Sequence, residues 1–291
     1  MSSTIVASLE HATRLVSIYL GVPMLIVGVI GGVCNVVVFL SLRIFRRNSC
    51  AFYLTVMSFV NIVILLTSLL TRITISGFGV DWSQSSVLYC KWRVFINQGS
   101  ILMSLTCICL ATIDQYLSTR VSSRLPYESD MKLTRVITIL FLVVWLLHGT
   151  PYLFYYGLNV SRSTGITACS VASISFQKYT VYGFLLTLSG VVPLLITIVF
   201  GLLAYRNVRQ IAHRTVPLVR REMDKQMTTM VLVHIIFDLF TLLPYIVVRI
   251  VALDDSLMDD PVTRAFIQFM TIFTVYLYYM YFVVSQRRSI V

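Results

Sequence analysis

The feature that most constrains this chain is a series of seven apolar runs, each long enough to cross a lipid bilayer. A bilayer core about 30 Å thick requires about 20 apolar residues in a helix. The runs begin near Val16, Phe52, Val87, Leu133, Tyr179, Met227 and Val262. Strands of a membrane barrel would alternate apolar and polar residues, whereas a run such as Ile137 to Leu147 is almost wholly apolar. The sequence therefore predicts an all-α bundle of seven transmembrane helices.

The expected helices leave only short connections between them, so a single domain over residues 1–291 is predicted. Their approximate ranges are 16–42, 51–75, 87–118, 132–156, 178–206, 222–252 and 261–284. The composition agrees with a membrane protein, because 57% of the residues are hydrophobic and only 12% are charged.

The basic residues predict the orientation of the bundle. Most of the 23 lysines and arginines lie in the first, third and fifth connections and in the C-terminal tail. Positive charge is retained on the cytosolic side, so we expect the N-terminus outside, the C-terminus in the cytosol and the chain in the plasma membrane. The net charge of +11 then reflects topology and attraction to anionic lipid, and no nucleic-acid partner is expected.

Two of the six cysteines fall on the oxidising outer side, Cys90 at the start of the third run and Cys169 in the loop after the fourth. This topology predicts a disulfide between them, with two free thiols as the alternative. The outer sequence Asn159-Val160-Ser161 is a candidate glycosylation site, although it lies close to the end of a helix.

Short motifs recur in order along the seven runs. They are Gly32-Val33-Cys34-Asn35-Val36-Val37-Val38, Met57-Ser58-Phe59-Val60-Asn61, Asp114-Gln115-Tyr116, Trp145 with Pro151, Pro193, Pro244 and Leu277-Tyr278-Tyr279-Met280-Tyr281. Together with the seven helices and the outer cysteine pair, they resemble rhodopsin-like (class A) G-protein-coupled receptors. The stretch from Asn48 to Leu65 and the missing Trp before Pro244 are most similar to invertebrate peptide receptors of the FMRFamide-receptor kind.

The resemblance implies a cell-surface receptor that binds an extracellular ligand, expected to be a small peptide, and signals through movement of the sixth helix. Its partners would be a heterotrimeric G protein, arrestin or both, together with membrane lipid. It would be no enzyme and would need no cofactor or metal. A transporter or channel is the rival from another class, but the chain lacks the inverted repeats of such proteins.

The inner motif departs from the family pattern. The resemblance places the G-protein-facing switch at Asp114, Gln115, Tyr116, Asp224 and Tyr281. The family has an arginine where this chain has Gln115, and a neutral amide cannot form the charge-assisted pair that arginine makes. Either Gln115 still supports coupling through hydrogen bonds, or the protein is a receptor that activates no G protein and acts as a decoy or through arrestin.

A second polar set is expected in the middle of the bundle, at Asn35, Asn61, Ser104, His234 and Asp238. The resemblance implies a sodium pocket, but this chain lacks its carboxylate, so we expect a neutral cluster without sodium. Asp238 and His234 lie four residues apart on one helix face. They form either a pH-sensitive switch or a protonated Asp238 bound within the cluster.

Steps of seven place Cys90, Asn97 and Ser104 on one face of the third helix. Asn97 stands where the resemblance puts the aspartate of amine receptors, so a monoamine ligand is disfavoured. The residues expected to form the ligand pocket are Asn97, Gln98, Tyr152, Tyr245, Arg249 and Gln268, with Arg72 and Tyr155 at its mouth. Simple packing is the alternative for each of them. The four aspartates between 254 and 260 are either a patch that steers a cationic peptide or a solvated turn.

Overall fold

The structure is a computed structural model, and it describes residues 2–41, 48–119, 131–160, 167–211, 236–237, 239–254, 257 and 260–287. The long helices on the N-terminal side are α1 (Ser2–Tyr19), α2 (Gly21–Ser41), α3 (Ser49–Ile64), α4 (Leu70–Phe78), α5 (Val87–Thr119) and α6 (Met131–Tyr155). After a hairpin of β1 (Tyr156–Val160) and β2 (Thr167–Val171) come α7 (Ile174–Lys178), α8 (Val192–Ile211), a short helix at Leu239–Val251 and α10 (Pro261–Arg287). Two π-helical segments, Leu65–Leu69 and Tyr179–Val191, join α3 to α4 and α7 to α8.

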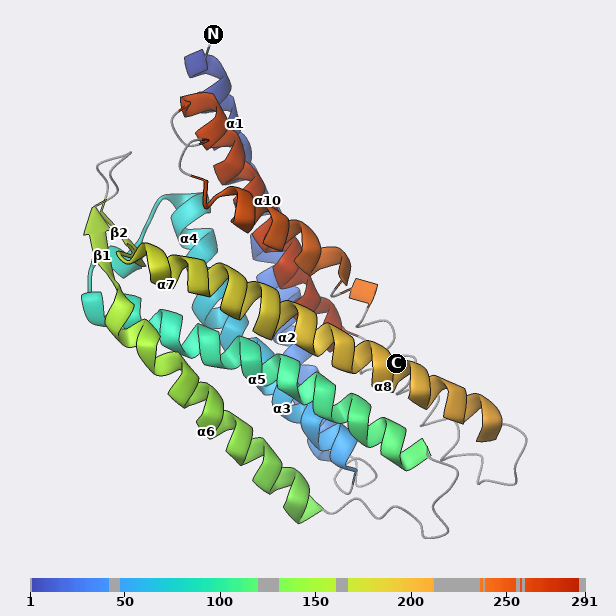
Figure 1. The fold of residues 1–291 in the computed structure, drawn as a ribbon. Coiled ribbons are helices and arrows are strands. Elements are labelled where there is room, and N and C mark those ends of the chain that lie inside the picture. Colours follow the sequence, from blue (N-terminus) through green and yellow to red (C-terminus); the bar gives the residue numbers. More distant parts are fainter. Residues whose placement is uncertain are drawn as a thin grey trace.

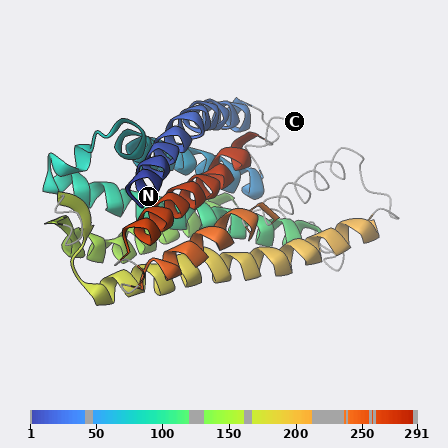
Figure 2. The ribbon, with the colours of Figure 1, turned by 90° about the horizontal axis from the view of Figure 1, so that it is seen from above.

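The helices lie side by side in one bundle (Figures 1 and 2). Six helical spans of the described residues are long and apolar enough to cross a membrane, and Leu239–Val251 is a shorter apolar helix that we call the sixth membrane helix. Helix α5 is the most enclosed span, with α3, α6 and α8 packed against it, whereas α6 is the least enclosed. The all-α transmembrane bundle predicted from the apolar runs is confirmed.

The first helix begins earlier than expected. The sequence predicted a start near residue 16, but α1 begins at Ser2 and continues almost without interruption into α2. It lies beside the outer part of α10 in both views (Figures 1 and 2) and also packs against α4. Arg14 Nε donates to the carbonyl of Gly77 in α4 (3.0 Å). Because α1 is stabilised by these neighbours, polar residues such as Glu10 do not end it, and a criterion based on apolar runs could not detect this extension.

The outer end of α4 is closed by local hydrogen bonds. Gly79 adopts a left-handed conformation with φ of 72°, which glycine tolerates because it has no Cβ. Its N–H donates to the carbonyl of Ile75, and the N–H of Val80 donates to that of Thr74, so the last turn of the helix is satisfied. Asp81 then caps the short 3-10 turn at Trp82–Gln84 by accepting from the N–H and hydroxyl of Ser83. The chain can therefore turn sharply toward Cys90.

Two glycines seven residues apart bring α2 close to its neighbours. A Cβ at Gly21 would lie 2.6 Å from Ile73, and one at Gly28 would lie 2.5 Å from Leu65. Both distances are too short for any larger side chain. Small residues commonly let membrane helices approach in this way, since lipid provides no hydrophobic force to drive them together.

The π-helical segment before α8 widens the turns of the fifth membrane helix. The hydroxyl of Ser189 donates to the carbonyl of Phe184, and the hydroxyl of Thr187 donates to that of Tyr182, both five residues back. Pro193 follows in the first turn of α8, where proline leaves a backbone carbonyl without its usual partner. π-Helical turns are often found at functional sites, and this one faces the cavity described next.

Candidate ligand-binding site

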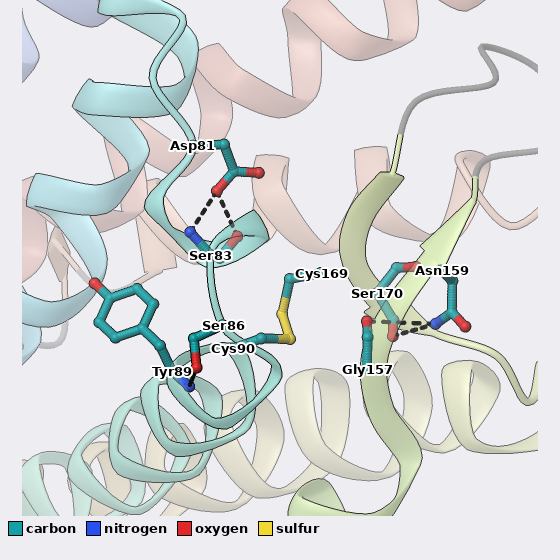
Figure 3. Close-up of a disulfide and its surroundings, with 9 residues drawn as sticks. All are labelled: Asp81, Ser83, Ser86, Tyr89, Cys90, Gly157, Asn159, Cys169 and Ser170. Atoms are coloured by element: carbon teal, nitrogen blue, oxygen red, sulfur yellow. Dashed lines mark hydrogen bonds between the residues drawn. A yellow bond between two sulfur atoms is a disulfide. The ribbon is translucent and has the colours of Figure 1, made fainter.

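The outer mouth of the bundle is covered by a disulfide-linked hairpin (Figure 3). Strands β1 and β2 are antiparallel, with Leu158 opposite Cys169. Cys169 forms a disulfide with Cys90 at the outer end of α5, and their Cα atoms lie 5.8 Å apart. The predicted disulfide is confirmed, and the alternative of two free thiols is wrong. The bond fixes the hairpin above the space between the helices.

Beneath the hairpin lies a cavity of about 440 Å³, a volume within the range of small-molecule and short peptide pockets. Its walls come from α4, α5, both strands, the second π segment, the sixth membrane helix and α10. Four of the residues predicted for the pocket line it, namely Asn97, Gln98, Tyr245 and Arg249.

The remaining two predicted pocket residues do not line the cavity. Tyr152 is fully buried behind its wall, where its hydroxyl accepts a hydrogen bond from Gln98 Nε2 (2.8 Å) and its ring lies 5.0 Å from that of Phe176. Gln268 is exposed on α10, whose buried positions at this height are Ala265 and Ile267. Tyr152 therefore positions a lining side chain, and Gln268 lies exposed about one turn beyond Thr271, the outermost lining residue of α10.

The sequence reasoning missed one charged lining residue, Arg93. It lies four residues before Asn97, so it shares a face of α5 with that predicted residue, and this spacing was the signal that could have found it. Arg72, which was expected near the mouth, also lines the cavity. With Arg249, the two place three guanidinium groups around one space.

Tyr156 of the hairpin lies among these arginines. Burial raises the pKa of its phenol, and the positive charges of Arg249, Arg93 and Arg72 act in the opposite direction. All three arginines therefore lie within electrostatic range of one hydroxyl. Since the phenol remains neutral at physiological pH, its O–H is available as a donor to a bound group.

The inner side of the cavity is lined by stacked aromatic rings. Tyr245 of the sixth membrane helix stacks on Tyr278 of α10 with ring centroids 5.4 Å apart and planes at 14°. Tyr278 packs edge-on against Phe282 (5.2 Å), and Phe282 packs against Tyr281 (5.1 Å). A continuous row of rings thus leads from the cavity along α10 toward the inner side.

Part of the predicted polar core lies between the cavity and the inner side. Ser104 donates to Asn61 Oδ1 over 2.6 Å, and both residues are fully buried. Asn35 of α2 is also fully buried. His234 and Asp238 lie outside the described residues. The bond from Ser104 satisfies the amide oxygen of Asn61 inside the bundle.

Comparison with known proteins identifies the family. The family model described as 7 transmembrane receptor (rhodopsin family) matches residues 33–284, which is most of the chain. The chain belongs to this family. It is therefore a multi-pass receptor of the plasma membrane, which receives its ligand on the outer face. No curated protein matches the receptor closely enough to indicate a ligand.

The inner residues of the receptor are largely enclosed in this conformation. Only 9% of Asp114 and 3% of Gln115 are exposed, and Tyr281 is buried as well. Tyr116 packs against Phe200 of α8, with ring centroids 5.6 Å apart. Asp224, which was predicted to belong to the same switch, lies outside the described residues. A cytosolic partner could reach Gln115 only after these helices separate.

The candidate glycosylation site of the receptor is engaged in the hairpin. Asn159 is partly buried, and the side-chain nitrogen that would carry the glycan donates to the carbonyl of Ser170 over 2.8 Å (Figure 3). A glycan would replace one of the two N–H groups of this nitrogen, which could then no longer donate to both Gly157 and Ser170. The geometry thus disfavours modification at Asn159.

Proposed function

We propose that the receptor binds a small peptide in the outer cavity and responds by moving the sixth membrane helix, so that a heterotrimeric G protein can dock on the inner side. One observation carries the proposal most strongly. Tyr245 lines the cavity and belongs to that helix, and its ring stacks on Tyr278 of α10. A ligand that displaces Tyr245 would therefore act directly on the contact between these two helices.

The packing on the other side of the sixth membrane helix supports this route. Gly190 lies at the end of the π segment, and a Cβ there would lie 3.3 Å from Ile246 and 3.6 Å from Leu242. The fifth and sixth membrane helices therefore touch here through small, apolar contacts. Sliding at such a contact breaks few specific interactions, as is typical of helices that move during switching.

A peptide ligand fits the chemistry of the walls. The cavity combines aromatic rings with amide and guanidinium groups, which suits a molecule that has both apolar side chains and polar backbone groups. Asn97 offers no charge to pair with a monoamine. Of the resemblance to FMRFamide-type peptide receptors, this proposal keeps the peptide class of the ligand and leaves its C-terminal group open.

Gln115 favours a second candidate function, in which the receptor binds its ligand without activating a G protein. Gln115 has no charge, and its backbone carbonyl accepts from the hydroxyls of Ser118 and Thr119 on the same helix. In this case the receptor would recruit arrestin or remove its ligand from the surroundings.

A peptide-library screen on cells that express the receptor separates the two candidates, with G-protein dissociation and arrestin recruitment measured independently. A peptide that triggers G-protein dissociation in the wild type supports the main proposal. A peptide that binds but triggers dissociation only in Gln115→Arg supports the second. Failure of every peptide in both readouts, with the receptor at the cell surface, would refute a peptide ligand.

A further inference from the structure

Three arginines from three different helices line the same cavity. Arg72 comes from α4, Arg93 from α5 and Arg249 from the sixth membrane helix. Ionised side chains within membrane spans are costly, and they usually face the bundle interior and carry function. The positive-inside rule offers no explanation for these three, because it places arginine on the cytosolic side.

The cavity supplies no counter-charge of its own. Among the residues that the structure describes, its lining includes no aspartate or glutamate. Arg93 Nε is buried and has no hydrogen-bond acceptor among the described residues. Arg72 lies close enough to act on the charge of Arg93, while Asp81 acts on it less than Arg72 does and already accepts from Ser83. The cavity therefore holds like charges together, which is unfavourable unless an anion lies between them.

Neutral groups beside the arginines are also available as donors. Tyr156 lies within electrostatic range of all three guanidinium groups, and Gln98 and Asn97 line the same wall. The planar guanidinium fork binds a carboxylate through two parallel hydrogen bonds, and such charge-assisted bonds are about twice as strong as neutral ones. The lining is thus suited to an anionic group on an otherwise apolar or aromatic ligand.

We infer that the ligand carries a carboxylate and that Arg72, Arg93 and Arg249 bind this group inside the cavity. The inference rests on the proposed function, because it concerns the same cavity. The carboxylate belongs either to the free C-terminus of a peptide or to a small organic acid. A strictly cationic or fully amidated ligand is disfavoured.

Of the four aspartates between 254 and 260, Asp255 and Asp259 lie outside the described residues, and Asp260 does not oppose this assignment. Asp260 accepts hydrogen bonds from the N–H and the hydroxyl of Thr263 (2.8 and 2.7 Å), so it caps the start of α10. These bonds hold the pKa of the Asp260 carboxyl below its usual value. Its role is therefore that of a helix cap at a solvated turn, outside the cavity lining.

The inference is tested by ligand-induced thermal stabilisation of the purified receptor in lipid nanodiscs, which measures binding without any signalling step. Two matched pairs serve as probes, phenylbutyrate with phenylbutyramide and N-acetyl-Phe-Leu with its C-terminal amide. The acid of at least one pair should raise the melting temperature well above its amide. Arg93→Gln should lower the affinity for the acid, measured from the concentration dependence of this shift, by about tenfold or more, which is the loss expected for one charge-assisted interaction.

The controls separate the possible sources of an effect. Arg72→Gln and Arg249→Gln should act in the same direction, whereas Arg264→Gln, which removes a charge near the mouth outside the cavity lining, should not. A larger acid-specific shift with N-acetyl-Phe-Leu indicates the C-terminus of a peptide, and a larger one with phenylbutyrate indicates a small organic acid. Equal or absent shifts for acid and amide, or an equal shift with inorganic phosphate, would overturn the inference. A failed signalling screen alongside an acid-specific shift would refute only the proposed coupling.

Discussion

The outer and inner halves of the receptor differ in the charge and the surroundings of their polar residues. In the outer half, three arginines surround an enclosed space and lack acidic partners in its lining. In the inner half, Asp114 and Gln115 are buried against neighbouring helices, and the position that carries an arginine in the family is neutral. The outer half thus carries three positively charged side chains around a cavity, whereas the inner half has a neutral amide at the position of the family's arginine. Ligand recognition and coupling can therefore be perturbed separately.

The largest effect is expected from removing the disulfide of the outer half. Cys90→Ser opens a loop with a sequence separation of 79 residues. Closing a loop of this length stabilises by about 4 kcal/mol in the chain-entropy model, or less where helices already restrain its ends. The melting temperature should fall, and the acid probes should no longer bind. Cys34→Ser, which removes an exposed free thiol, is the control. Equal melting temperatures for the two variants would contradict the role of the hairpin.

The second largest effect is expected in the inner half, where one substitution should change coupling to the G protein without changing ligand binding. Gln115→Arg supplies the positive charge that this position lacks and should raise G-protein dissociation by about tenfold, since a charge-assisted hydrogen bond from the guanidinium to a docked G protein would contribute about 1.5–3 kcal/mol. Binding of the acid probes should remain unchanged. Gln115→Lys carries the same charge without the planar fork and should gain less. No gain in either variant would show that this position does not limit coupling.

A smaller effect is expected where the two halves meet. Tyr245→Leu removes the ring that stacks on Tyr278, and such aromatic pairs contribute about 0.5–1.5 kcal/mol. Signalling by an activating peptide should decrease about fivefold, while Tyr245→Phe, which keeps the stacked ring, should signal normally. A loss of binding without a change in signalling per bound ligand would assign Tyr245 to recognition alone.

The smallest effect is expected in the middle of the bundle. Ser104→Ala removes the hydroxyl that donates to the buried Asn61 Oδ1 and should destabilise by about 0.6 kcal/mol, the average for hydrogen bonds between membrane helices. Ser100→Ala, one turn earlier on α5 and only half-buried, provides the matched control. Identical thermal unfolding of the two variants would show that the pair of Asn61 and Ser104 contributes nothing to stability.

The sequence predicted features that depend on lipid and topology. Apolar runs determine which segments span the bilayer, and the oxidising side determines that Cys90 pairs with Cys169. It could not predict features that depend on packing between distant segments. Helix α1 begins at Ser2 because it packs on α4 and α10, and the π segments and the hairpin likewise escaped prediction.

The ligand site was predicted in part for the same reason. Heptad spacing on α5 found Asn97, and the neighbouring turn held Arg93. Gln268 lies on the same face of α10 as the lining residue Thr271 but about one turn beyond it, and where the cavity ends along α10 depends on the neighbouring segments. The meeting of Arg72, Arg93 and Arg249 follows from three helices far apart in the chain, so only the assembled bundle shows it.

Binding of an acid probe to the wild type, Arg93→Gln and Gln115→Arg receptors in nanodiscs tests the account most directly. Outer-half recognition predicts that Arg93→Gln weakens binding by about tenfold or more, while Gln115→Arg leaves it within about threefold of the wild type. Equal binding of the acid by the wild type and Arg93→Gln, or a loss confined to Gln115→Arg, would contradict the division of the receptor into a recognising outer half and an altered inner half.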